Sequence, residues 1–281
     1  MTALPRIILS ARRVLSCAAA VAALAAAAIL GGCGTMANGR GWGQDATLAP
    51  GWDRVGRAAW NALAAPETWA PAAGAVAFHE IGNADQKVSD WASRSTPVFG
   101  SQDHASRMSD DLAMAADVIW VASAVAAPSG DAFDDWFVNK LKGLGVQTGT
   151  TILLHSTVSG LKDAFERTRP NGEPGSMPSG HASNASLAST MASKNIETMG
   201  WSDTAVAVTQ FGLGTLTAAA SWARVEAQKH YPSDVLAGIA LGHFFGAFFT
   251  DAFLGIDDPN AVLVLFEPSR DGVAATLRFG F

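Results

Sequence analysis

Three short blocks of polar residues in the second half of this 281-residue chain carry groups that could do chemistry together. In chain order they are Lys162 with Arg169 and Pro170, the segment Pro-Ser-Gly-His at 178–181, and Arg224 with His230 and Asp234. They supply three cations, two imidazoles and one carboxylate. Such a set can hold a phosphate, attack it with an imidazole and protonate the group that leaves.

The first block places two cations at the end of an expected helix. Six residues separate Lys162 from Arg169, which is two helical turns, so both side chains lie on one face. Pro170 ends the helix and disfavours the α conformation at Arg169. The guanidinium is therefore expected at a helix end, where it can bond two phosphate oxygens. Arg167 and Glu166 fit a solvated helix face instead.

The second block opens a helix made of small residues, 182–186. Free backbone N–H groups and the positive end of the helix dipole would there point at an anion. Gly180 lets the backbone approach that anion closely.

The third block combines a histidine with a carboxylate. Pro232 fits the first turn of a helix, Asp234 lies in that turn, and His230 comes just before it. A carboxylate bonded to one ring nitrogen sets the tautomer and makes the other nitrogen more nucleophilic. His230 is therefore the candidate nucleophile, forming a phosphohistidine that water then hydrolyses.

The order and spacing of these blocks resemble the phosphatidic acid phosphatase type 2 (PAP2) superfamily, which includes class A acid phosphatases and vanadium haloperoxidases. The resemblance implies that His181 is the general acid for the leaving alcohol. It also implies a phosphate-binding role for one group of residues: Lys162, Arg169, Ser179, Gly180 through its amide, and Arg224. One position departs from the family pattern, because Ala223 stands where a serine usually precedes the arginine. That serine is not the nucleophile, so the chemistry is expected to survive.

No metal and no cofactor is expected. The remaining histidines lack the spacing of metal ligands and are interpreted as structural. They are His79, His104, His155 and His243.

The expected fold is all-α, a helical bundle of the acid phosphatase/vanadium haloperoxidase type with a short C-terminal β-hairpin. Breaks at Gly, Pro and Asn predict helices near 52–65, 69–80, 84–95, 103–127, 131–143, 146–167, 181–198, 203–225 and 232–253. Asp110 or Asp111 is a candidate helix cap. Residues 260–281 alternate in hydrophobicity around Asp271-Gly272, which predicts the hairpin.

The first 32 residues resemble a lipoprotein signal peptide. Three arginines precede an apolar run from Val14 to Leu30, and Leu30-Gly-Gly-Cys33 resembles a lipobox. Cys33 would then be lipidated, residues 33–50 would form a flexible tether, and 51–281 the phosphatase domain. The alternatives are an ordinary signal peptide or an uncleaved anchor. Gly34 after the cysteine favours the outer membrane, with the protein on the periplasmic side.

Charge and hydropathy narrow the range of partners. The formal charge of −6 becomes −9 when residues 1–32, with three arginines and no acid, are removed. An acidic chain is a poor nucleic-acid binder. No mature stretch reaches eighteen apolar residues without a charge, which favours a soluble body held by a lipid. The expected substrate is a phosphorylated lipid or a small phosphate ester, and the oligomeric state stays open.

Two alternative functions use the same residues. A vanadate-dependent haloperoxidase would hold vanadate where the phosphatase holds phosphate. A catalytically silent lipoprotein would use the bundle only as a scaffold.

Overall fold

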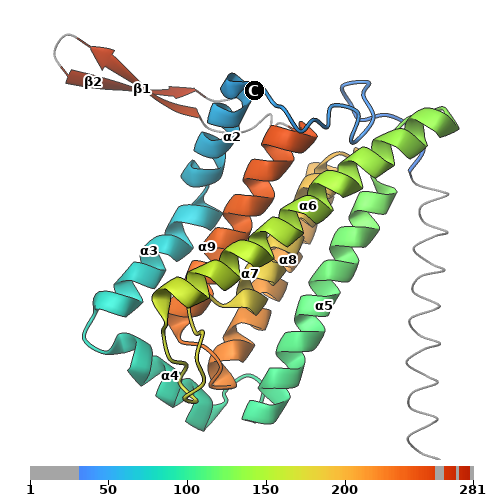
Figure 1. The fold of residues 1–281 in the computed structure, drawn as a ribbon. Coiled ribbons are helices and arrows are strands. Elements are labelled where there is room, and N and C mark those ends of the chain that lie inside the picture. Colours follow the sequence, from blue (N-terminus) through green and yellow to red (C-terminus); the bar gives the residue numbers. More distant parts are fainter. Residues whose placement is uncertain (1–31, 257–262, 270–271, 279–281) are drawn as a thin grey trace, which may run out of the picture.

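The computed structural model describes residues 32–256, 263–269 and 272–278 (Figure 1). Within these residues the chain is almost entirely helical, which confirms the all-α body of the prediction. The helices are α2 (Trp52–Ala64), α3 (Pro66–Glu80), α4 (Ala84–Ser95), α5 (Gln102–Ala126), α6 (Phe133–Phe165), α7 (Gly180–Glu197), α8 (Asp203–Glu226), α9 (Pro232–Phe249) and the short π-helix η1 (Thr250–Leu254).

Helix α7 lies at the centre of the bundle and packs against α5, α6, α8 and α9. The α7–α9 contact is unusually close because α9 presents glycines to it. A Cβ atom at Gly242 would lie 2.2 Å from the carbonyl oxygen of Ser183, and one at Gly238 would lie 2.7 Å from that of Ser179. The two helices run in the same direction, since Ser179 N donates to Asp234 O at one end and Lys194 pairs with Asp251 at the other. Two helix N-termini therefore lie side by side.

The predicted break between residues 143 and 146 is wrong, because this region forms part of the long helix α6. Gly143 and Gly145 do not interrupt it, and 33 residues form one continuous helix. The reason lies in packing, because a Cβ atom at Gly143 would come within 2.3 Å of the Trp42 ring. The glycine makes room for a tryptophan and does not end the helix.

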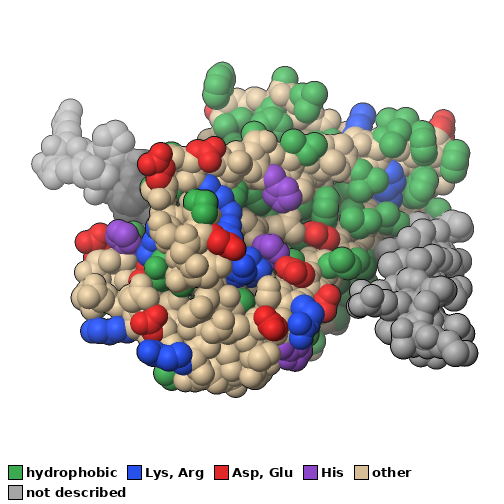
Figure 2. Space-filling model, turned by 60° about the horizontal axis from the view of Figure 1, so that its bottom comes forward, with side chains coloured by type: hydrophobic (Ala, Val, Ile, Leu, Met, Phe, Trp, Pro, Cys, Tyr) green, Lys and Arg blue, Asp and Glu red, His purple; other side chains and the backbone are tan. Residues whose placement is uncertain are grey.

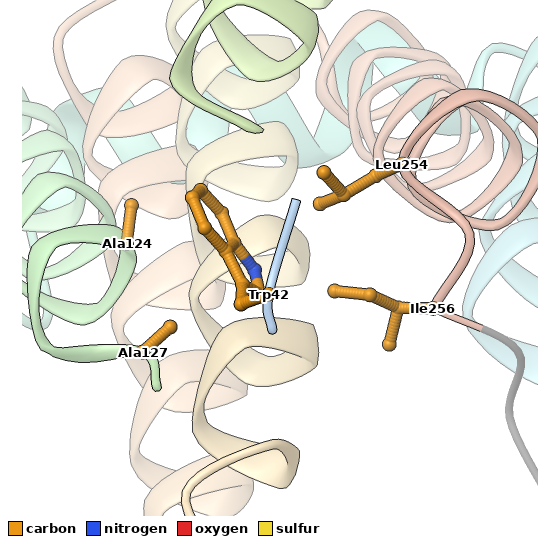
Figure 3. Packing of buried hydrophobic residues seen from close by; sticks show 5 residues of the cluster. All are labelled: Trp42, Ala124, Ala127, Leu254 and Ile256. Atoms are coloured by element: carbon orange, nitrogen blue, oxygen red, sulfur yellow. The ribbon is translucent and has the colours of Figure 1, made fainter. Parts of the chain in front are cut away.

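The prediction of a flexible tether at residues 33–50 is wrong, because the segment around Trp42 packs into the core. Trp42 is fully buried among Ala124, Ala127, Leu254 and Ile256 (Figure 3). Its indole Nε1 donates to Oδ1 of Asn195 at 3.0 Å. A buried tryptophan stabilises a segment by several kcal/mol, on the order of 3–5. Apolar burial thus fixes a stretch whose Gly- and Ala-rich composition predicts mobility.

The helix cap predicted at Asp110 or Asp111 is wrong, because both residues lie inside α5. The helix begins at Gln102, where the Ser101 hydroxyl accepts from His104 N at 3.2 Å. Asp110 is therefore an interior helical residue.

The C-terminal part of the chain contains two antiparallel strands, β1 (Leu263–Ser269) and β2 (Gly272–Arg278). Phe266 pairs with Ala275, and Ser269 pairs with Gly272. The other residues of the predicted hairpin, 260–262, 270–271 and 279–281, lie outside the described residues, as does Asp271 at the predicted turn.

Candidate active site

The three sequence blocks meet at one end of the bundle, the lower end in Figure 1. Lys162 lies in the last turn of α6, and Arg224 in the last turn of α8. Gly180 begins α7, and Asp234 lies in the first turn of α9. Figure 2 views this end and shows basic side chains and a histidine together in the middle of the face, with acidic side chains beside them.

The cations at this end are close enough to perturb one another. Burial is the main cause that lowers the pKa of Lys162, and the charges of Arg169 and Arg224 lower it further. The pKa of Arg224 is also lowered, chiefly by burial. Like charges held together in a partly dry site are unfavourable until an anion arrives. Arg224 Nε is moreover buried without a hydrogen-bond partner among the described residues. The cluster is therefore suited to bind an anion.

The helix start predicted near His181 is confirmed, with the first helical residue at Gly180. Ser179 is the fully buried N-cap, and its hydroxyl accepts from Ala182 N at 3.5 Å. A Cβ atom on Gly180 would lie 4.0 Å from Lys162 Nζ. The free N–H groups of the first turn of α7 thus lie beside a cation of the cluster.

His230 and Asp234 lie next to each other and are almost completely buried. His230 Nδ1 lies 3.7 Å from Asp234 Oδ2, which is longer than a hydrogen bond. Nδ1 has no partner among the described residues. Burial lowers the pKa of His230 to about 4, although Asp234 opposes that shift. The imidazole is therefore neutral at ordinary pH, as a nucleophile must be.

Asp234 is held in place by groups that the sequence blocks do not include. Its Oδ2 accepts from Tyr231 N at 2.8 Å and from the Ser176 hydroxyl. Its Oδ1 accepts from Arg167 Nη1 at 2.7 Å. Burial alone would raise the pKa of Asp234, but His230, Ser176 and Arg167 outweigh that effect and lower it. The carboxylate thus stays ionised beside His230.

The prediction that the Arg167 side chain is solvated is wrong, because its guanidinium pairs with two carboxylates. Besides Asp234, it bonds Ser233 Oγ through Nη1 and Asp85 Oδ2 through Nη2, each at 2.7 Å. Its guanidinium also lies 4.3 Å from the centre of the Tyr231 ring. Asp85 in turn accepts from Ser233 N at 2.8 Å. Arg167 therefore ties α4 to the first turn of α9.

His181 has a carboxylate partner that sequence spacing does not reveal. Its Nε2 lies 2.9 Å from Asp110 Oδ1, and the same oxygen lies 3.8 Å from Arg224 Nη1. Burial is the main cause that lowers the pKa of His181, Arg224 adds to it, and Asp110 opposes it. Asp110 is 71 positions before His181 and on another helix, so only the tertiary structure pairs them.

Arg169 lies at the outer part of the cluster. Its Nη1 contacts Glu173 Oε2 at 3.0 Å, and Glu173 also faces Lys229 at 3.4 Å. Because the Glu173 side chain is about half exposed, these ion pairs are weak and exchangeable. These ion pairs therefore add little to the stability of the fold.

Other polar features lie away from this end. Three of the four remaining histidines hydrogen-bond elsewhere: His104 to Phe99 O, His155 to Asn184, and His243 to Thr68. A cavity of about 650 Å³ lies between α2, α3, α7, α8 and α9, and no residue of the three blocks lines it. The residues of the three blocks thus lie at the helix ends and outside this cavity.

Comparisons with known proteins agree with the blocks. Residues 143–255 match the family model of the PAP2 superfamily. A search of curated proteins found no match. A solved structure, the first transmembrane PAP2-type phosphatidylglycerolphosphate phosphatase from Bacillus subtilis, is similar over 63% of this chain and 88% of its own, with 18% sequence identity and a TM-score of 0.47. The recognition made from the three blocks is therefore confirmed, and residues 143–255, which carry all of them, are a PAP2 superfamily region.

Proposed function

We propose that this protein is a metal-independent phosphatase that hydrolyses phosphate monoesters or diphosphates through a phosphohistidine intermediate. The observation that carries the proposal is the buried, neutral His230 beside a cluster of cations and the start of α7. A PAP2 phosphatase needs no more than these groups, and no cofactor enters the reaction.

Phosphate binding is assigned to the cations and to the second block. Lys162, Arg169 and Arg224 neutralise the oxygens, while the Ser179 hydroxyl and the Gly180 amide complete the cradle. Arg224 supports this role most directly, because its buried Nε has no partner among the described residues. These donors also stabilise the charge on the equatorial oxygens in the transition state.

The first chemical step is attack by His230 on phosphorus. Asp234 faces Nδ1, which leaves Nε2 as the attacking atom. The P–N bond forms as the bond from phosphorus to the leaving oxygen breaks, and His181 donates a proton to that oxygen. In the second step water attacks phosphorus and returns a proton to His181. The P–N bond then breaks and releases phosphate.

The roles of the histidines can be tested by their dependence on the leaving group. His230→Ala should abolish turnover and trap no phosphoenzyme. His181→Ala should slow alkyl phosphates far more than p-nitrophenyl phosphate, whose phenolate departs with little protonation, and should still form an acid-labile phosphohistidine. General acid catalysis contributes typically about 10²–10⁴-fold, which sets the expected loss on alkyl phosphates. His104→Ala, on the exposed side of α5, is the matched control. Phosphoenzyme in His230→Ala, or equal losses on both substrates in His181→Ala, would overturn the assignment.

The anchor and location form part of the same proposal. Cys33 is exposed at the start of the described chain, where a lipid could be attached without burying the acyl chains in the bundle. The protein is thus proposed to be lipid-anchored on the periplasmic side, in the outer membrane. Its substrate would be a phosphorylated lipid or a small phosphate ester.

A further inference from the structure

The residues that directly follow the proposed membrane attachment are held at one end of the bundle. Gly34 and Gly130 exchange two backbone hydrogen bonds, of 3.1 and 2.7 Å. Trp42 then locks the following segment into the core. The apolar run Val14–Leu30 ends just before Cys33. Whether that run is removed and Cys33 acylated, or retained as an anchor, the membrane attachment meets the bundle at the turn between α5 and α6.

Exposed aromatic residues lie at the same end. Phe133 is 77% exposed, Phe137 48% and Leu141 56%. Phe133 stacks on Phe137 with the ring centres 6.2 Å apart, outside the core. Asp131, Asp134 and Asp135 surround them and disfavour an anionic surface. An apolar patch beside the attachment point, with a polar and acidic border, suits the interface of a zwitterionic bilayer.

The active site lies at the other end of α6. Phe133 begins the helix and Lys162 lies in its last turn, with no break between them. At about 1.5 Å per residue, the two are separated by roughly 43 Å. The apolar run and Gly31-Gly32 are followed by Cys33 and then by Gly34, which is hydrogen-bonded to Gly130. No long linker therefore lets the active-site end of α6 approach the membrane.

We propose that the α5–α6 end, through Phe133, Phe137 and Leu141, docks on the bilayer that anchors the chain, and that the active site faces away from it. The protein then acts on phosphate esters that reach it from the aqueous space or from a facing surface, and not on lipids of its own membrane. The substrate part rests on the proposed phosphatase activity, and the orientation rests on the proposed membrane attachment just before Gly34. The competing orientation lays α6 flat on the membrane through Ile152 and Leu153, which are 63% and 45% exposed.

Orientation can be measured without any enzymatic activity. In the proposed mature protein Cys17 is removed with residues 1–32 and the Cys33 sulfur carries lipid, so a single new thiol can carry a fluorophore. Asp134→Cys labels the proposed docking end, and Ala164→Cys labels the end of α6 near the site; both positions are exposed. In phosphatidylcholine vesicles that contain a headgroup quencher, we expect strong quenching at 134 and none at 164. Quenching at both positions would show the flat orientation, and quenching at neither would show that this end does not dock. Either result overturns the proposal.

Access to substrate gives a second test. The lipidated protein in vesicles should hydrolyse phosphatidic acid of its own bilayer slowly, relative to its turnover of p-nitrophenyl phosphate. A linker of about 60 Gly and Ser residues between Cys33 and Gly34 has an average reach of about 43 Å, which matches the separation of the two ends of α6. It should raise hydrolysis in the same bilayer at least about tenfold, because a linker that spans the sites restores the effective concentration.

The control is the same linker placed between Gly200 and Trp201, in the exposed connection between α7 and α8. It should leave both activities unchanged. Equal hydrolysis of same-bilayer lipid with and without the Cys33 linker would refute the proposal. Loss of p-nitrophenyl phosphate turnover in the unmodified protein would instead refute the phosphatase function, and the quenching result would still decide the orientation.

Discussion

At the scale of single residues, the candidate site depends on ion pairs that hold the candidate catalytic side chains in place. Arg167 contacts both Asp234 and Asp85, and Asp110 contacts His181. Two of the three acids involved are buried, so each is stable as an anion only while its partner stays. The three blocks supplied the candidate catalytic residues, whereas the residues that contact and hold them come from α4, α5 and the loop after α6.

The role of Arg167 leads to a prediction about catalysis and stability together. Arg167→Gln leaves Asp85 and Asp234 as uncompensated buried charges, so we expect a loss of about 3–5 kcal/mol in the free energy of unfolding. In the folded fraction, kcat should fall while KM for p-nitrophenyl phosphate changes little, because Asp234 shifts and the phosphate cations do not. Urea titration and steady-state kinetics measure the two effects. Arg107→Gln, on the exposed surface of α5, is the control. A rise in KM with unchanged kcat would instead make Arg167 a phosphate ligand.

The two histidines also predict an acidic pH optimum for alkyl phosphates. His230 must be deprotonated to attack, so kcat/KM should rise as the pH increases through about 4. His181 must be protonated to act as acid, and burial holds its pKa below the usual 6.5. Activity should therefore fall again as the pH passes the His181 pKa, below 6.5. A pH profile of kcat/KM measures both limbs. His181→Ala should lose the descending limb, and a maximum above pH 7 would contradict these assignments.

At the scale of elements, the site is set by helix ends brought to one level. Helices α7 and α9 start side by side because glycines of α9 admit the backbone of α7. The residues that end α6 and α8 then face those two N-termini. The predicted helix ends near the candidate catalytic residues are confirmed, because proline and capping residues act locally. The predicted break inside α6 is wrong, because Gly143 makes room for the ring of Trp42, which is about 100 residues away in the chain.

Two neighbouring glycines of α6 test that explanation. Gly143→Ala should destabilise the protein by about 1–3 kcal/mol, since the new methyl group overlaps the Trp42 ring. Gly145→Ala has open space around the added atom and should stabilise by about 0.5–1 kcal/mol through helix propensity. Thermal and urea unfolding compare the pair. If the two variants behave alike, the Trp42 contact does not explain the continuity of α6.

At the scale of the whole molecule, the bundle places the proposed membrane attachment and the candidate active site at opposite ends of α6. In the part of the chain that the structure describes, one helical segment, Pro232–Leu254, has the length and composition of a membrane span, but over half of its most apolar window is buried inside the bundle. Its burial is that of a core helix.

The proposed anchor gives the corresponding prediction. Cys33→Ser should prevent acylation, so the protein should leave the membrane fraction while keeping its turnover of p-nitrophenyl phosphate, because the site is far from residue 33. Fractionation, with mass spectrometry of the N-terminus, measures the outcome. A variant that stays membrane-bound and retains residues 1–32 would favour the uncleaved anchor.

The sequence by itself determined the helical class and the match of residues 143–255 to the PAP2 superfamily, and it named the candidate catalytic residues. Helix ends, phosphate donors and the His230–Asp234 spacing are encoded within a few residues of one another. Only the tertiary structure decided the packing of Trp42 against Gly143, the pairing of His181 with Asp110, and the ion pairs of Arg167. Each of these joins residues that are far apart in the chain, and close packing or charge burial selects them only once the helices have assembled.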